Sequence, residues 1–99
     1  MRLNHITDTI LGEAVQAQPD DEFDTHCLIN WICRHRPREY AVDLHAALVD
    51  DGDPFVSLHT AIGRRLAALP SIVRQQHRKR PSMNIRGESS PCEVWRRVS

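Results

Sequence analysis

The sequence has few aromatic residues, few glycines and no long apolar run, and these shortages exclude several classes of protein. Five of its 99 residues are aromatic and four are glycine, whereas 40% are apolar. Because the apolar content is near average and the formal net charge is zero, we expect one folded domain rather than a disordered chain. No stretch approaches the roughly 18 consecutive apolar residues of a membrane span.

Paired cysteines and a secretory leader are also missing. The three cysteines, Cys27, Cys33 and Cys92, are an odd number without paired spacing, which is typical of reduced thiols rather than of a disulfide framework. The first residues lack the apolar core of roughly 7–15 residues that a signal peptide needs. We therefore expect a cytoplasmic protein with no membrane partner.

The zero net charge conceals a division of the chain into an acidic half and a basic half. Residues 1–53 hold four basic and eleven acidic residues, a net charge of about −7, and residues 54–99 hold nine basic and two acidic residues, a net charge of about +7. Such asymmetry favours a polyanion partner for the basic half. The alternative is that the two halves neutralise each other, within one domain or across a dimer.

Apolar spacing predicts four helices. Apolar residues recur with the period of an amphipathic helix over residues 4–17, 21–35, 38–49 and 54–69. Gly52 marks the turn before the last helix, and Asp53–Pro54 has the pattern of an N-cap followed by proline at the first helical position. We expect the first helix to lie in an N-terminal arm, residues 1–20, that packs on the domain of residues 21–99, pairs with a second copy or frays.

After Pro70 the pattern changes to that of a β-hairpin. β-Branched residues begin a strand over 72–77, and residues 92–98 alternate with a period of two. Turn-forming residues between them predict a long tip, residues 78–86, with Arg78, Lys79, Arg80 and Arg86 on it and no acid nearby. The sequence thus predicts a mainly α protein with a C-terminal β-hairpin, an α+β fold.

The order of helix, helix, turn, helix and basic hairpin resembles that of winged helix-turn-helix DNA-binding proteins, over about residues 21–98. The resemblance implies a three-helix core plus a wing, to which the N-terminal helix is an addition. It implies that helix 54–69 enters the major groove of double-stranded DNA while the hairpin grips the backbone or minor groove. We expect no cofactor and no catalysis.

Three residues of helix 54–69 are candidates for DNA contacts. Thr60 and Arg64 lie one turn apart on its slim outer face, where arginine can bond O6 and N7 of guanine and threonine can reach a base edge or a phosphate. Ser57, near the helix N-terminus, can join the backbone amides in holding a phosphate. The alternative is that Arg64 and Arg65 form an ordinary solvated face. We therefore interpret the chain as a transcriptional regulator of a prokaryote or phage. Its homodimer would bind a DNA site with two-fold symmetry.

A metal site is not predicted. His26, Cys27, Cys33 and His35 lie close in sequence, but one helix carries them all. Cys27 and Cys33 are about 240° apart around that helix, so they do not face one ligand point. The sequence has no Cys-x-x-Cys pair and no His-x-x-x-His pair.

An enzyme is not predicted either, because the chain has no glycine-rich phosphate loop and no nucleophile elbow. Glu39, Asp43 and His45 are expected to be surface residues rather than acid–base partners.

The main alternative function is a protein-interaction module of the same fold that does not bind DNA. Its basic hairpin would dock on an acidic protein, or its acidic N-terminal half would imitate a polyanion, as a phage-type inhibitor does. Removal of the basic tip should abolish DNA binding, whereas a mimic should fail after loss of Asp20, Asp21 and Glu22.

Overall fold

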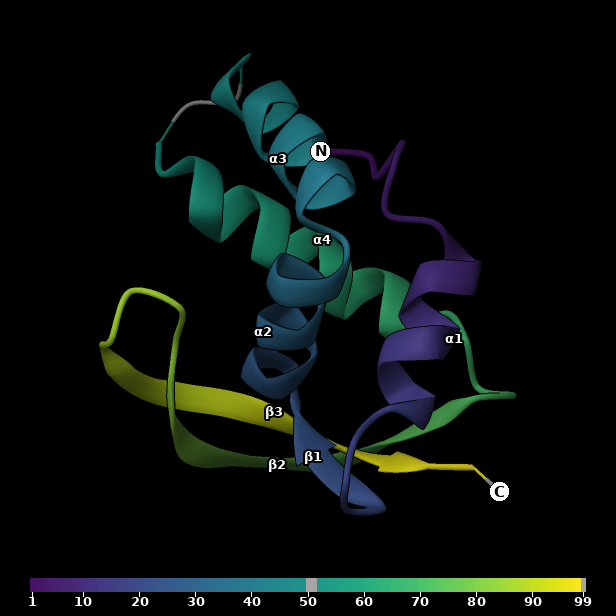
Figure 1. Ribbon diagram of the computed structural model, residues 1–99. Coiled ribbons are helices and arrows are strands. Elements are labelled where there is room, and N and C mark those ends of the chain that lie inside the picture. The colour runs from purple at the N-terminus through teal and green to yellow at the C-terminus, as the bar shows by residue number, and fades with distance from the viewer. Residues whose placement is uncertain (50–51, 99) are drawn as a thin grey trace.

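Four α-helices pack on one side of a three-stranded antiparallel sheet within residues 1–49 and 52–98, the part of the chain that the computed structural model describes (Figure 1). The helices are α1 (Asp8–Gln16), α2 (Thr25–His35), α3 (Pro37–Ala46) and α4 (Pro54–Ala67), and a 3-10 turn, η1 (Ala47–Val49), follows α3. The strands are β1 (Glu22–Asp24), β2 (Val73–Met83) and β3 (Ser89–Arg97). The predicted α+β class is confirmed.

The start of α4 is the one that the sequence predicts. The side chain of Asp53 accepts a hydrogen bond from the amide of Phe55 at 2.8 Å, and Pro54 occupies the first helical position. Gly52 has a φ of 99°, a backbone region that favours glycine. Asp50 and Asp51, which the prediction assigns to the same turn, lie outside the described residues.

The predicted helix over 21–35 is wrong at its start, because Glu22–Asp24 form β1. Phe23 lies opposite Trp95 of β3, and the strand order is β1-β3-β2. The side chain of Asp24 accepts from the amide of Cys27 at 3.0 Å and so caps α2, which begins at Thr25. The predicted helix over 38–49 is also corrected, since it continues as the 3-10 turn η1 after Ala46.

The hairpin has longer strands and a shorter tip than the sequence predicts. Only residues 84–88 connect β2 to β3, so Arg86 is the one predicted tip cation that lies on the tip. Arg78, Lys79 and Arg80 lie within β2. Pro81 does not interrupt β2 because this strand is at the edge of the sheet, where a missing amide hydrogen is tolerated.

The core lies between the helices and the sheet. Side chains that are essentially inaccessible to solvent include those of Leu11, Leu28, Leu58, Leu66 and Trp95. The predicted apolar stripe of the first helix is part of this core, because Leu11, Ala14 and Val15 of α1 are fully buried. The stripe is therefore turned inward and is not free to pair with a second copy. No helix of the described ranges is long and apolar enough to cross a bilayer.

Candidate nucleic-acid interface

A groove of about 600 Å³ runs between α4 and the β2–β3 hairpin. Four of the seven predicted contact residues line it: Thr60 and Arg64 from α4, Lys79 from β2 and Arg86 from the tip. Gly63 also lines the groove, and a Cβ atom added there would meet nothing within 4 Å. In Figure 1 the tip of the hairpin lies below the first turns of α4. Residues of both elements line the groove.

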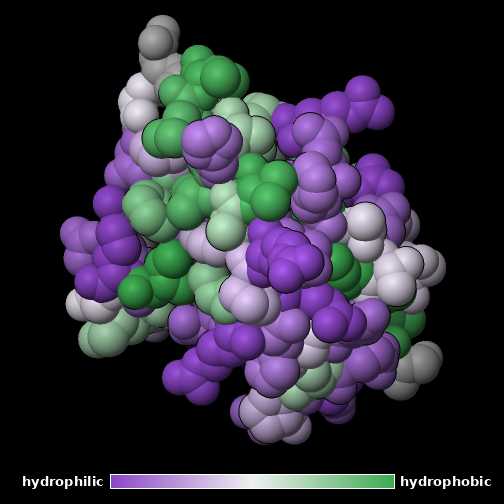
Figure 2. Space-filling model, turned by 45° about the horizontal axis from the view of Figure 1, so that its top comes forward, coloured by the Kyte–Doolittle hydropathy of each residue, from purple (hydrophilic) through white to green (hydrophobic). Residues whose placement is uncertain are grey.

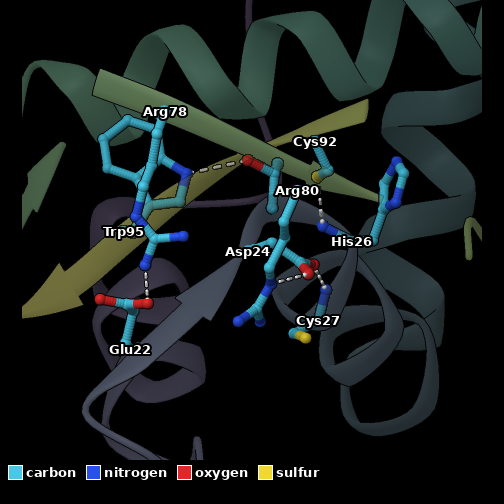
Figure 3. A network of polar contacts seen from close by, with 9 residues as sticks. Glu22, Asp24, His26, Cys27, Arg78, Arg80, Cys92 and Trp95 are labelled. Atoms are coloured by element: carbon cyan, nitrogen blue, oxygen red, sulfur yellow. Dashed lines mark hydrogen bonds and ion pairs between the residues drawn. The ribbon is translucent and has the colours of Figure 1, made fainter. Parts of the chain in front are cut away.

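The other three predicted residues do not line this groove. Ser57 is half-buried on α4. Arg78 forms an ion pair with Glu22, and the Nε atom of Arg80 lies 2.9 Å from Oδ2 of Asp24. Both arginines therefore tie β2 to β1, which lies on the far side of β3 (Figure 3).

The basic residues are largely neutralised by acids from the first half of the chain. Among the described residues, five ion pairs join the acidic half to the basic half: Asp8–Arg65, Asp21–Arg97, Glu22–Arg78, Asp24–Arg80 and Asp53–Arg86. The expectation that no acid lies near the hairpin cations is wrong, because their partners come from positions 33 to 56 residues away. Neutralisation within one domain, an alternative that the sequence leaves open, therefore occurs at these five pairs.

Arg86 fastens the tip of the hairpin to the start of α4. Its Nη2 lies 2.8 Å from Oδ2 of Asp53, its Nε lies 3.6 Å from Oε1 of Glu88, and its Cζ lies 4.9 Å from the centre of the Phe55 ring. The guanidinium beside Asp53 holds the pKa of that carboxyl below its usual value. Arg86 thus holds the two walls of the groove together.

Arg64 and Lys79 are the exposed cations of the groove that form no ion pair with any described residue. Lys79 lies opposite Glu93 in the strand register, but the Glu93 carboxylate accepts a hydrogen bond from Nε2 of Gln75 at 3.1 Å. The neighbouring Arg65 differs, since it pairs with Asp8 at 2.5 Å. Two positive charges are therefore available to an anionic ligand in the groove.

A histidine of the groove contributes no charge near neutral pH. The Nε2 of His59 lies 2.7 Å from the hydroxyl of Tyr40, and burial lowers the pKa of His59 to about 4. Phe55 packs edge-on against the same imidazole. The part of the groove that Phe55 and His59 line is therefore uncharged.

Asp43 is fully buried, which corrects the expectation that it is a surface residue. Its carboxylate accepts hydrogen bonds from the amides of His5 at 3.1 Å and Ile6 at 2.9 Å. These hydrogen bonds hold the N-terminal segment against α3. Because backbone amides occupy the carboxylate, its role is structural. No spacing in the sequence links position 43 to positions 5 and 6.

No protein-family model, curated protein or solved structure matches the chain.

The face shown in Figure 2 is mostly hydrophilic, but apolar side chains gather over α3 and η1. Val42, Leu48 and Val49 are exposed there, and Val49 is 87% exposed.

Sequence reasoning missed His26 and Cys92, which also line the groove. Helical spacing relates only residues of the same helix. Cys92 lies on β3, so no spacing in the sequence connects it to His26 of α2.

Proposed function

We propose that this protein binds double-stranded DNA as a winged helix-turn-helix protein and acts as a transcriptional regulator in a prokaryote or phage. The observation that carries the proposal is the groove between α4 and the hairpin, in which Arg64 and Lys79 are exposed and free of ion pairs. Cations held on a slim helix beside a hairpin are suited to a sugar–phosphate strand. The order of two helices, a turn, a third helix and a hairpin supports the same proposal.

In this proposal α4 lies in the major groove, and Thr60 and Arg64 contact base edges. Lys79 neutralises a phosphate of the strand that passes between α4 and the hairpin. Arg86 has a positioning role, because its contacts with Asp53 and Phe55 hold the hairpin at a fixed distance from α4. Arg78 and Arg80 also have a positioning role, because their ion pairs with Glu22 and Asp24 hold the middle of β2 against β1.

The polyanion-mimic alternative has less support than DNA binding. It depends on the acids at positions 20–22, and two of the three are engaged within the chain: Asp21 with Arg97 at 2.9 Å, and Glu22 with Arg78. A homodimer also remains a proposal. Because the apolar stripe of α1 is buried, self-association would have to use another surface, such as the exposed Val42, Leu48 and Val49.

The test is selection of duplexes from a random pool, followed by affinity measurements on the enriched site. We expect the unchanged protein to enrich a motif, and Arg64→Ala to lose preference at a single base pair at a cost of about 1–3 kcal/mol. Lys79→Gln is the matched control, because loss of a phosphate contact weakens binding to all sequences alike. Absence of both binding at low salt and an enriched motif would overturn the proposal.

A further inference from the structure

Three potential metal ligands, two from the junction of β1 and α2 and one from β3, lie close together. Asp24 ends β1 and caps α2, His26 is the second residue of α2, and Cys92 lies on β3. One ligand atom from each residue lies within 4.8 Å of the others. Figure 3 shows the three residues next to one another, with the Asp24 carboxylate also in its ion pair with Arg80.

One ring nitrogen of His26 has no hydrogen-bond partner among the described residues. The Nδ1 atom of His26 is buried and forms no hydrogen bond with any described residue. Buried ring nitrogens are nearly always bonded, because an unpaired polar atom loses its hydration without replacement. A nitrogen in this condition, beside a carboxylate and a thiol, points to a ligand.

The other two ligand atoms are held in place. The Asp24 carboxylate accepts from the amide of Cys27 at 3.0 Å and from Nε of Arg80 at 2.9 Å. The Cys92 sulfur accepts from the amide of His26 at 3.3 Å. The side chains of Ser82 and Cys27 also form hydrogen bonds with this carboxylate, so a cation that binds Asp24 replaces one of these neutral donors.

We propose that Asp24, His26 and Cys92 bind a Zn²⁺ ion through a carboxylate oxygen, Nδ1 and Sγ. Thiolate, imidazole and carboxylate together are a donor set that suits zinc. Ligand atoms around tetrahedral zinc lie roughly 3.3–3.6 Å apart, so a closure of about 1 Å completes the site. His26 and Cys92 also line the groove, which leaves a fourth position open to water or to a ligand from that side.

The charge balance sets a limit on affinity. The Asp24 carboxylate and the Cys92 thiolate together neutralise the ion, and the thiol proton is released to solvent on binding. The Arg80 guanidinium adds one positive charge next to Asp24 and opposes binding. The site is therefore expected to be a reversible one rather than a permanent structural centre.

The test is titration of the reduced, chelator-treated full chain with Co²⁺, followed by displacement with Zn²⁺. We expect one cobalt ion per chain, a thiolate-to-cobalt charge-transfer band in the near ultraviolet and the visible d–d bands of a tetrahedral site. Cys92→Ser should remove the charge-transfer band. His26→Gln should keep the band but weaken binding about tenfold or more.

Cys33→Ser is the matched control, because Cys33 is a half-buried thiol that does not belong to the cluster. It should leave both the band and the affinity unchanged. Circular dichroism checks that each variant is folded. Cobalt binding without a thiolate band, or equal affinity in the unchanged protein and His26→Gln, would overturn the proposal. The readout is spectroscopic, so the result is independent of DNA binding.

Discussion

The ion pairs around the hairpin determine how strongly salt should weaken DNA binding. Each phosphate contact made by a cation contributes about −0.9 to the slope of log affinity against log salt concentration. If Lys79 alone contacts a phosphate while Arg64 contacts a base edge, the slope is about −0.9, and affinity falls about 3.5-fold between 50 and 200 mM salt. If Arg78, Arg80 and Arg86 also contacted phosphates, four contacts would give a slope of about −3.6 and a fall of about 150-fold.

Fluorescence anisotropy of a labelled duplex, titrated over a salt series, measures this slope. Lys79→Gln should reduce its magnitude by about 0.9, since the side chain is exposed in the groove and forms no ion pair with any described residue. Arg78→Gln is the adjacent control, and it should leave the slope unchanged because Arg78 is engaged with Glu22. A steep slope near −3.6, or equal effects of the two substitutions, would refute the inference that the ion pairs keep the hairpin arginines from contacting phosphates.

Three further predictions concern α4, the groove and the N-terminal segment. Gly63→Ala should stabilise α4 by about 0.5–1 kcal/mol but weaken DNA binding, because Gly63 lines the groove. Gly12→Ala should stabilise α1 without affecting DNA binding. Urea melts measure the stability of each variant, and anisotropy measures its DNA binding. The pKa of His59 is lower in the folded chain than in the unfolded chain. The free energy of unfolding should therefore be constant above about pH 6.5 and should decrease by roughly 2–3 kcal/mol as the pH falls toward 4. Urea midpoints across that range measure this loss, and His59→Gln should flatten the dependence. Asp43→Ala should cost roughly 2–3 kcal/mol in a thermal or urea melt, because it leaves buried amides without an acceptor; an unchanged midpoint would contradict this account.

The sequence predicts the elements whose signals are local. Helix α4 begins at Pro54 as predicted, because a capping carboxylate and a proline act on the residues next to them. Strand β1 could not be predicted in the same way. It is three residues long, and its single apolar residue, Phe23, also fits the period of the following helix. The strand forms only by pairing with Trp95 and its neighbours, 70 to 74 positions later in the sequence.

The candidate site was predicted in part for the same reason. Thr60 and Arg64 lie together on one helix, so helical spacing is sufficient to place them on one face. The state of the hairpin cations depends on partners far away in sequence, such as Asp24 for Arg80, which is 56 positions distant. A count of charges shows that the two halves of the chain carry opposite net charge. It does not show that the acids of the first half pair with the arginines of the second half in the same molecule.

The pairing of the two halves also affects how the chain assembles. Residues 1–53 and 54–99, if made as separate fragments, would carry about −7 and +7 charges and would attract each other over many ångströms at low ionic strength. Exposed ion pairs add little to final stability, so their main effect is on the rate of encounter. Fragment reassembly should therefore slow steeply as salt is added, while the reassembled core of Leu11, Leu58 and Trp95 is held by apolar contacts that salt does not screen.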